Sequence, residues 1–175
     1  EFGRLDVLVN NAGTTRFVSH ADLAGLEKDD FFHIYGVNVV GPYQMARAAE
    51  SALRASGDAA IVNVSSIAGV RGVGSSIAYA ASKGALITMT KSLARVMGPE
   101  IRVNTVCPGF IEGDWLREGM GDALYEQNRQ RIIDRTPLQR VCTPESVAES
   151  ILGFVAGHSI ISGEHIILDG GRFLN

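Results

Sequence analysis

Three side chains between Asn63 and Lys83 have the chemistry needed to move a proton to or from a carbonyl or an alcohol. Tyr79 and Lys83 are four residues apart, so they share one face of a helix. Ser66 follows an apolar run that predicts a buried strand, and ligands of parallel sheets bind beyond the carboxyl ends of the strands. A phenol, an ammonium and a hydroxyl that meet in one crevice indicate acid–base chemistry.

The Tyr79–Lys83 pair gains its weight from its position in the chain. Exposed pairs at this spacing are common on helices, so the pair alone is weak evidence. Here it lies one turn into a predicted helix that follows the carboxyl end of a predicted strand. A phenol with a pKa of about 10 is a poor acid–base catalyst at neutral pH, and a cation within about 4–6 Å lowers that pKa. We therefore expect Lys83 to lower the pKa of Tyr79.

Ser66 has two interpretations. A serine after a strand is most often a turn or cap residue, but beside the pair it can donate a hydrogen bond that polarises a substrate carbonyl. A serine hydrolase is disfavoured, because no histidine of the chain stands in a context that would complete a serine–histidine–aspartate triad. The histidines are His20, His33, His158 and His165.

Apolar runs of strand length alternate with helical segments, and these elements must position the three side chains. The expected strands span residues 5–10, 60–64, 101–107 and 165–168. The expected helices span residues 27–55, 78–97 and 143–156, with a bend at Gly41–Pro42. Continuously apolar strands that alternate with helices predict a parallel sheet covered on both faces. Residues 112–135 are more polar, and we expect them to form a mobile flap over the site.

Three glycines, Gly69, Gly72 and Gly74, lie between the second strand and the helix of Tyr79, as the glycines of a dinucleotide-binding loop would. A loop of that kind needs an acidic residue at the end of a strand about 20 residues further on, and the sequence has none there. We therefore expect these glycines to let the loop approach a substrate.

The composition fits one globular domain that spans residues 1–175. A net charge of −3 argues against a nucleic-acid or anionic-membrane surface, and no apolar run approaches the roughly 20 residues of a membrane span. The sequence contains neither a signal-peptide pattern nor a metal-binding cluster. We expect a cytoplasmic protein without a metal, in which Cys107 and Cys142 are free buried thiols.

Six motifs occur in order over almost the whole chain. They are NNAG (10–13), Asn38 within a helix, VNVSS (62–66), YAASK (79–83), RVNTVCPGFI (102–111) and SGEHIILDGG (162–171). Their order and spacing resemble those of the classical short-chain dehydrogenases/reductases. The resemblance implies an α/β fold with a doubly wound, mostly parallel sheet of the Rossmann type. It also implies an oxidoreductase that uses NAD or NADP to interconvert a secondary alcohol and a ketone, as 3-oxoacyl-carrier-protein reductases do.

The resemblance implies roles for individual residues. Tyr79 would be the general acid for carbonyl reduction and the base for alcohol oxidation, and Lys83 would lower its pKa and hold the nicotinamide ribose. Ser66 would hold the substrate oxygen. Asn38 would anchor a water that links Lys83 to solvent, satisfy a kink in its helix, or do both. Besides Tyr79 and Lys83, the cofactor would contact Asn11, Ala12 and Gly13 on its adenosine side and Pro108, Gly109 and Ile111 on its nicotinamide side.

Part of the family's pattern has no counterpart in the chain. The family begins with a TGxxxGxG loop, and the first three β–α units are missing here. The chain would supply the last four strands of the order 3-2-1-4-5-6-7, so residues 5–10 would form a bare edge. The sequence leaves NAD and NADP equally open, because the residue that selects between them belongs to the missing part. Gly113 and Asp114 stand where the family often has a threonine that touches the nicotinamide amide.

Three hypotheses follow from these observations. The first is an enzyme with a small-molecule carbonyl or alcohol substrate, whose natural chain is longer and assembles into a homodimer or homotetramer. The second is a truncated or non-catalytic relative that acts as an assembly partner, and NAD(P)H binding separates it from the first. The third, an epimerase or dehydratase of the extended branch of the family, is disfavoured by the NNAG motif and the short carboxyl-terminal region.

Overall fold

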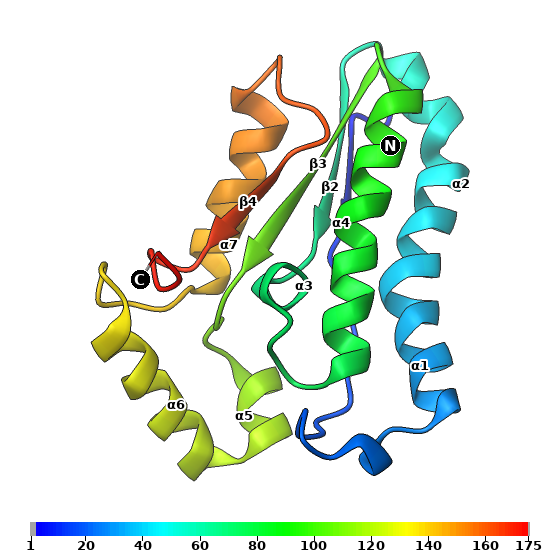
Figure 1. Ribbon diagram of the computed structural model, residues 1–175. Coiled ribbons are helices and arrows are strands. Elements are labelled where there is room, and N and C mark those ends of the chain that lie inside the picture. The colour runs from blue at the N-terminus through cyan, green and yellow to red at the C-terminus, as the bar shows by residue number, and fades with distance from the viewer. Residues whose placement is uncertain (1–2, 175) are drawn as a thin grey trace.

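A parallel sheet of four strands forms the centre of the molecule (Figure 1). The computed structural model describes residues 3–174, and the strands lie side by side in their order along the chain. They are β1 (Val7–Asn10), β2 (Ala59–Val64), β3 (Ile101–Pro108) and β4 (His165–Leu168). The predicted strands and their parallel arrangement are confirmed, and β1 lies at one edge of the sheet as expected.

The helices connect the strands and account for most of the remaining chain. The longer ones are α1 (Lys28–Tyr35), α2 (Gly41–Ser56), α4 (Ile77–Met97), α6 (Asp122–Arg135) and α7 (Pro144–Leu152). The short ones are η1 (Leu23–Gly25), α3 (Ile67–Arg71), α5 (Asp114–Met120) and the π-helical turns η2 (Gly36–Val40) and η3 (Gly153–Gly157). The irregularity expected at Gly41–Pro42 is the turn η2, which lies directly before them and joins α1 to α2.

Both faces of the sheet are covered, because alternate strand residues point to opposite sides. On one face Ile61 and Val103 pack against Leu53 of α2 and Met97 of α4. On the other face Val62, Val64 and Val106 pack against Val147 of α7 and Phe154 of η3. The sheet is therefore doubly wound, as its continuously apolar strands predicted.

A chain of buried polar side chains ties α4 to three strands. Asn10, Asn63 and Thr105 occupy one row across β1, β2 and β3. Asn10 donates to Asn63 at 2.8 Å, Asn63 donates to the Thr90 hydroxyl of α4 at 2.9 Å, and the Thr90 and Thr105 hydroxyls are 2.6 Å apart. Since an unpaired buried polar group is costly, this chain of hydrogen bonds favours one register of α4 on the sheet.

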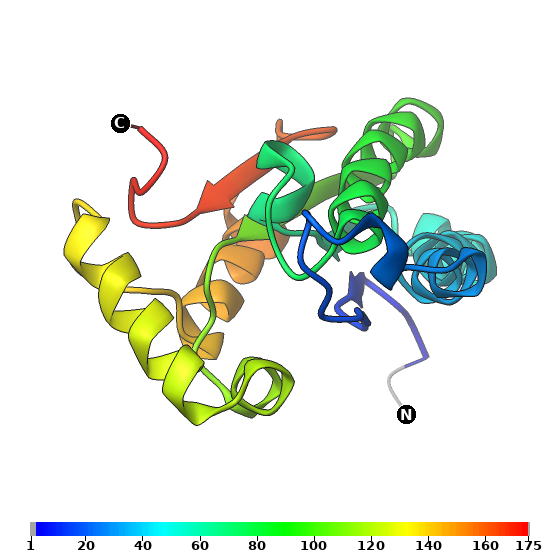
Figure 2. The same cartoon turned by 60° about the horizontal axis from the view of Figure 1, so that its bottom comes forward.

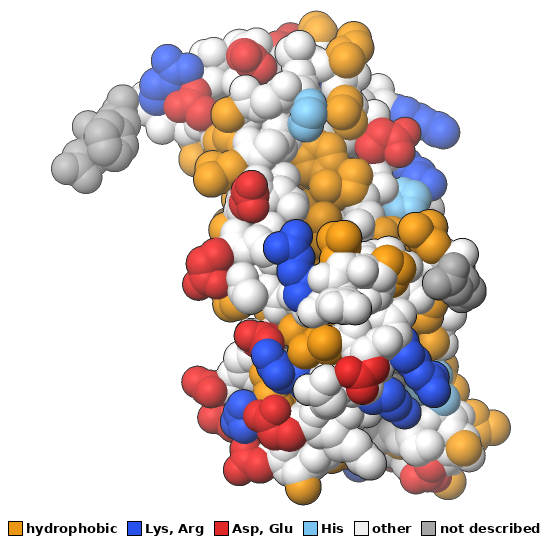
Figure 3. Space-filling model, turned by 90° about the vertical axis from the view of Figure 1, so that its left-hand side faces the viewer, with side chains coloured by type: hydrophobic (Ala, Val, Ile, Leu, Met, Phe, Trp, Pro, Cys, Tyr) orange, Lys and Arg blue, Asp and Glu red, His pale blue; other side chains and the backbone are white. Residues whose placement is uncertain are grey.

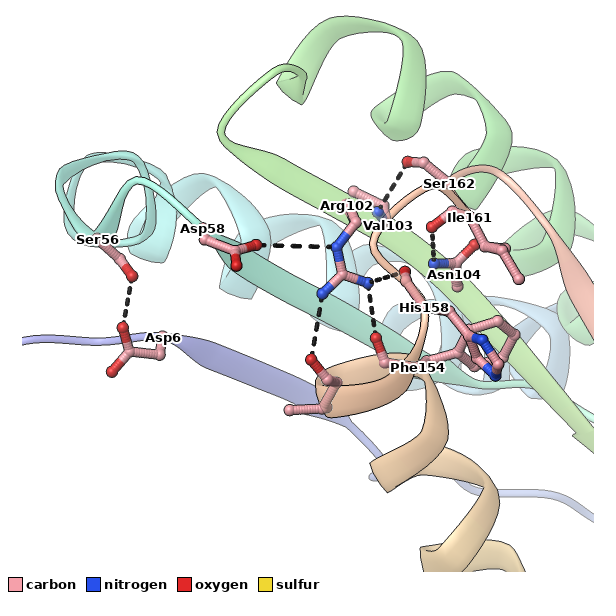
Figure 4. Close-up of polar contacts among 11 residues, drawn as sticks. Asp6, Ser56, Asp58, Arg102, Val103, Asn104, Phe154, His158, Ile161 and Ser162 are labelled. Atoms are coloured by element: carbon pink, nitrogen blue, oxygen red, sulfur yellow. Dashed lines mark hydrogen bonds and ion pairs between the residues drawn. The ribbon is translucent and has the colours of Figure 1, made fainter.

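At the amino-terminal end of the sheet, Arg102 of β3 holds the carboxyl-terminal end of the α7–η3 segment (Figure 4). Its guanidinium donates hydrogen bonds to the carbonyls of Phe154, Val155 and His158 at 2.7, 3.2 and 2.9 Å. These carbonyls have no partner inside the helix, and a cation is the favourable charge at a helix carboxyl terminus. Arg102 therefore fastens the helical layer on one face of the sheet.

Residues 112–135, the predicted flap, form the helices α5 and α6, which meet at Gly121. Gly121 has a φ of +83°, a conformation that favours glycine. The predicted mobility of this segment stays a prediction. Within residues 3–174, no helix has both the length and the apolar character needed to span a membrane.

Candidate active site

The predicted site residues gather beyond the carboxyl ends of the strands, the edge that Figure 2 turns toward the viewer. The loop after β1, the helix α3 and the pair α5–α6 surround this edge. Ser66 and Tyr79 line the same cavity, which has a volume of about 900 Å³. The hydroxyl and the phenol proposed from the sequence are thus brought together, as the parallel-sheet rule predicts.

The first turn of α4 sets the position of Tyr79 and Lys83. Ser76 is the N-cap, and its hydroxyl accepts a hydrogen bond from the Tyr79 amide at 3.2 Å. Lys83 lies one turn later and is 3% exposed. Its Nζ donates to the Val64 carbonyl at the end of β2 at 2.9 Å and lies 5.6 Å from the centre of the Tyr79 ring. The two side chains therefore share one face of α4, as their spacing predicts.

Ser65 and Ser66 have different partners, although they are adjacent. The Ser65 hydroxyl donates to the Lys83 carbonyl at 2.8 Å and so joins the end of β2 to α4. The Ser66 hydroxyl accepts from the Ala68 amide at 3.1 Å as the N-cap of α3, and it lies 3.5 Å from the Pro108 carbonyl. Ser66 is therefore a helix cap that also lines the cavity, so the cap interpretation is confirmed and the contact with a substrate oxygen stays a prediction.

Asn38 lies fully buried in the π-helical turn η2. Its side chain accepts from the Thr14 amide at 2.8 Å and donates to the Thr14 carbonyl and the Ser82 hydroxyl, both at 2.9 Å. Ser82 in turn donates to the Tyr79 carbonyl at 2.7 Å. Asn38 thereby links the loop after β1 to the helix of Tyr79. Asn38 lies at a helix irregularity, but these hydrogen bonds go to other segments, so both of its predicted roles stay predictions.

Gly13 is the point at which the loop after β1 meets the buried amine. A Cβ at this position would lie 3.3 Å from Lys83 Nζ and 3.5 Å from Asn38 Oδ1. A side chain would therefore lie tightly against the amine, whereas its contact with Asn38 would be an ordinary one. The glycine of the NNAG motif allows this close approach.

Burial controls the protonation of the site. The pKa of Lys83 is lowered to about 8, because burial disfavours its charged form. The pKa of Tyr79 is raised, because burial outweighs the hydrogen bond of the Ser66 side chain, which acts in the opposite direction. The expectation that Lys83 lowers the pKa of Tyr79 is therefore wrong for this structure. Burial of the phenol dominates, and Tyr79 is a protonated acid at neutral pH.

The glycines after β2 do not all serve the approach of a substrate. A Cβ at Gly69 would lie 2.5 Å from the Gly84 amide nitrogen and 2.8 Å from the Lys83 carbonyl oxygen, so Gly69 allows α3 to pack against α4. Gly72 ends α3 with a φ of +66°. Of the three, Gly74 lines the cavity. The prediction was wrong for Gly69 and Gly72 because it did not include α3.

Aromatic side chains form one wall of the cavity beside Tyr79. The Trp115 ring of α5 lies 6.5 Å from the Tyr79 ring and 6.2 Å from the Phe17 ring. A Cβ at Gly119 would run into the Phe17 ring, so this glycine lets α5 approach the loop after β1. The wall therefore suits an apolar group next to the phenol.

The predicted cofactor contacts occupy the ends of β1 and β3, the two strands on either side of β2. Asn11, Ala12 and Gly13 are exposed after β1, while Pro108, Gly109 and Ile111 line the cavity after β3. The space that a Cβ at Gly13 would fill beside Lys83 Nζ fits the close approach of a ligand such as the nicotinamide ribose. Bound there, a nicotinamide cofactor would supply a hydride. The described part of the chain contains no cluster of metal-ligating side chains.

Several residues of the site could not be selected from the sequence. Ser82 lies inside YAASK, three residues after Tyr79, so helical spacing was an available signal for its contact with that turn. Trp115 belongs to the segment 112–135, which was expected to lie over the site, whereas Phe17 lies about 60 residues from Tyr79 and carried no signal. Cys107 and Cys142 are both free and buried, as predicted. Burial raises the pKa of the Cys107 thiol to about 11, so it stays protonated.

Comparison with known proteins agrees with this arrangement. The family model described as enoyl-(acyl carrier protein) reductase matches residues 1–172. The chain belongs to the short-chain dehydrogenase/reductase family. Enzymes of this family are NAD(P)-dependent oxidoreductases, so the predicted fold, enzyme class and cofactor class are confirmed.

Individual members of the short-chain dehydrogenase/reductase family align along nearly the whole chain. A protein assigned as ketoacyl reductase 2 of the granaticin polyketide synthase, from Streptomyces violaceoruber, is 44% identical over 99% of this chain and 68% of its own length. The 3-oxoacyl-[acyl-carrier-protein] reductase FabG of Thermotoga maritima is 39% identical over 98% of this chain and 67% of its own. The solved structure of ElxO with NADP bound superposes with a TM-score of 0.86 at 32% identity, covering 99% of this chain and 69% of that one. The chain thus spans about two thirds of the length of these relatives.

Proposed function

We propose that the protein uses NAD(P)H to reduce a ketone to a secondary alcohol, with Tyr79 as the proton donor and a 3-oxoacyl thioester as a fitting substrate class. The observation that carries this proposal is the shared cavity of Ser66 and Tyr79 above the buried Lys83. The ketoacyl reductases among its relatives support the substrate class.

Each residue has one task in the proposed reaction. The Ser66 hydroxyl donates a hydrogen bond to the ketone oxygen and so favours the negative charge that develops there. As the carbonyl carbon receives the hydride, Tyr79 gives its phenolic proton to that oxygen. The raised pKa of Tyr79 supports this direction, because it keeps the phenol protonated at neutral pH.

Lys83, Asn38 and Gly13 support the proton donor. Lys83 would hold the ribose of the cofactor, and its Nζ lies 5.6 Å from the centre of the Tyr79 ring. Asn38 holds the loop after β1 through two hydrogen bonds to Thr14. We propose that it also anchors a water through which a proton from solvent reaches Lys83. Excluding bulk water from the aromatic wall strengthens these interactions.

A reduction assay tests the proposal. The complete protein is mixed with acetoacetyl-coenzyme A and either NADPH or NADH, and consumption of the reduced nicotinamide is followed by absorbance. We expect hydroxyacyl product in a one-to-one ratio with oxidised cofactor. If neither NADPH nor NADH supports product formation, from this thioester or from simple ketones, the proposal is contradicted.

The alternative, a non-catalytic assembly partner, predicts a different result in a binding experiment. Titration of the complete protein with NADPH, followed by nicotinamide fluorescence, gives micromolar binding if the protein is the proposed enzyme. The assembly partner would give no change in fluorescence. Because the titration needs no substrate, a wrong choice of ketone does not affect it.

We also propose that the protein is a cytoplasmic homotetramer. Val40, Tyr43 and Met45, at the start of the α2 segment, are about half exposed. On the side drawn in Figure 3, hydrophobic side chains gather in the upper half, and the elements on that side, α7 and β4, carry the exposed Leu152 and Ile167. Exposed apolar surface on two sides supports two kinds of contact between copies. Light scattering after size-exclusion chromatography should give four times the mass of one chain.

A further inference from the structure

We propose that Arg131 and Arg172 bind an anionic group of the substrate, so that the substrate has a ketone or secondary alcohol at one end of an apolar body and a carboxylate or similar anion at the other. This inference rests on the proposed function, because both arginines line the cavity that contains Ser66 and Tyr79.

The turn after β4 directs Arg172 toward this cavity. Gly170 and Gly171 have φ values of +66° and +85°, and they turn the chain back on itself directly after Asp169. The Leu138 amide, just beyond α6, donates to the Gly170 carbonyl at 3.2 Å. The turn is therefore fastened to the end of α6, and Arg172 is half-buried rather than free in solvent.

Arg131 of α6 is exposed, but it lines the same cavity and has a polar neighbour there. Its Nη2 donates to the Asn128 side chain at 2.7 Å, and Asn128 also lines the cavity. Arg131 and Arg135 lie close enough to Arg172 to lower its pKa by charge repulsion, in addition to the effect of burial. Two guanidinium groups that repel each other gain from an anion placed between them.

A third arginine increases the positive charge at this end of the cavity. Arg71 of α3 donates to the Phe173 carbonyl at 3.1 Å, and the guanidinium groups of Arg71 and Arg172 lie 5.4 and 5.0 Å from the centre of the Phe173 ring. Phe173 itself lines the cavity. The arginines thus surround an apolar side chain, which suits a ligand with an apolar body and an anionic end.

The nearby carboxylates already have other partners. Glu112, which lines the cavity, accepts from Arg129 Nε at 2.7 Å. Asp169 uses one carboxylate oxygen to accept from the Gly171 amide at 2.8 Å and the other to accept from the Phe173 amide at 3.3 Å. Asp169 therefore stabilises the turn that presents Arg172, and its charge only partly offsets the lowering of the Arg172 pKa.

The topology gives the separation between the two ends of the substrate. Ser66 follows β2, and Arg172 follows β4, with β3 between them. Neighbouring strands are about 4.8 Å apart, so the carboxyl ends of β2 and β4 are separated by about 10 Å across the sheet. The anionic group of the substrate would therefore lie about two strands away from its carbonyl.

The test compares a carboxylate with a neutral molecule of the same shape. The complete protein is titrated by calorimetry with phenylbutyrate and with phenylbutanamide, in which an amide replaces the carboxylate. We expect the carboxylate to bind at least about ten-fold more tightly, as a charge-assisted hydrogen bond to arginine predicts. Arg172→Gln and Arg131→Gln should each remove most of this preference.

Arg140→Gln is the matched control, because Arg140 is exposed near the same turn but does not line the cavity. It should keep the preference, and thermal melting verifies that all three variants are folded. Equal binding of the two probes, no binding of the carboxylate, or an unchanged preference in both cavity variants would overturn the inference. The titration measures binding without turnover. Its result can therefore be interpreted even if the protein fails to reduce a ketone in the assay above.

Discussion

The ammonium of Lys83 is buried and also faces a backbone carbonyl, and its ionisation is linked to folding. Its pKa in the folded protein is about 8, compared with an ordinary value of 10.5. Between these pH values the unfolded chain binds a proton that the folded protein does not hold. The contribution of Lys83 to the free energy of unfolding therefore rises with pH over this interval.

The variant Lys83→Met measures this effect. The difference of about 2.5 between the two pKa values corresponds to about 3 kcal/mol. Relative to Lys83→Met, the unmodified protein should therefore gain up to about 3 kcal/mol in free energy of unfolding between about pH 8 and 10.5. Urea unfolding of both proteins across this range checks the prediction. If the free energies of unfolding of the two proteins differ by the same amount across this pH range, the amine stays charged in the folded protein and the prediction is wrong.

Replacement of Gly13 should affect catalysis much more than stability. The variant Gly13→Ala puts a methyl group 3.3 Å from Lys83 Nζ, so the amine must give way by a few tenths of an ångström. We expect kcat/KM for ketone reduction to fall about ten-fold or more, since small displacements of catalytic groups are costly. The free energy of unfolding should change by less than about 1 kcal/mol, because the glycine is exposed.

The control for this variant is Gly157→Ala, where a Cβ would meet no atom within 4 Å. It should leave both kcat/KM and urea unfolding unchanged. If Gly13→Ala retains full activity, the close approach of the loop to Lys83 has no catalytic importance.

At the scale of single residues, sequence spacing predicted which residues lie together when they share one helix or one strand. Tyr79 and Lys83 could be paired because a helix fixes the relation between positions four apart. Phe17, Arg131 and Arg172 could not be assigned, because tertiary contacts between distant segments bring them to the cavity. The direction of the Tyr79 pKa shift was wrong because it depends on how deeply the phenol is buried, which spacing does not reveal.

At the scale of elements, the contact between α3 and α4 depends on Gly69. The variant Gly69→Ala would place a methyl group against the backbone of Lys83 and Gly84, which cannot rotate away as a side chain can. We expect the free energy of unfolding to fall by about 2 kcal/mol or more, because overpacking typically costs about 1–3 kcal/mol and backbone shifts add to it. Urea unfolding of the complete protein measures the change.

The matched comparison is Gly84→Ala on the other side of the contact. A Cβ there would lie 3.3 Å from the Gly69 carbonyl oxygen, a milder conflict. Its cost should therefore be smaller than that of Gly69→Ala. Equal stability of Gly69→Ala and the unmodified protein would contradict the close packing of α3 on α4.

The elements were predictable where the apolar pattern was long. The strands at residues 60–64 and 101–107 and the helix at 78–97 differ from the observed β2, β3 and α4 by one residue at an end. Helix α3 was not predicted, because its five residues are too few for helical periodicity and contain a glycine. Tertiary contact with α4 stabilises it, which local sequence does not encode.

At the scale of the whole molecule, the four strands in sequence order place the carboxyl ends of β1, β2 and β3 next to one another. This arrangement explains why residues from the NNAG, VNVSS and RVNTVCPGFI motifs meet in space. Family resemblance predicted the order of these strands correctly. The segment that forms α5 and α6 was expected to lie over the site, and residues of both helices line the cavity. The shape of the cavity was not predictable, because this polar segment shows no strong periodicity.

The central claim is that Tyr79 donates the proton in ketone reduction, and the variant Tyr79→Phe tests it most directly. The variant removes the phenolic hydroxyl and keeps the ring that packs beside Trp115. We predict that kcat for ketone reduction by the complete protein falls by a factor of about 100 or more, the usual contribution of a general acid. The dissociation constant of NADPH, measured by fluorescence, should stay within several-fold. A kcat equal to that of the unmodified protein would contradict the account.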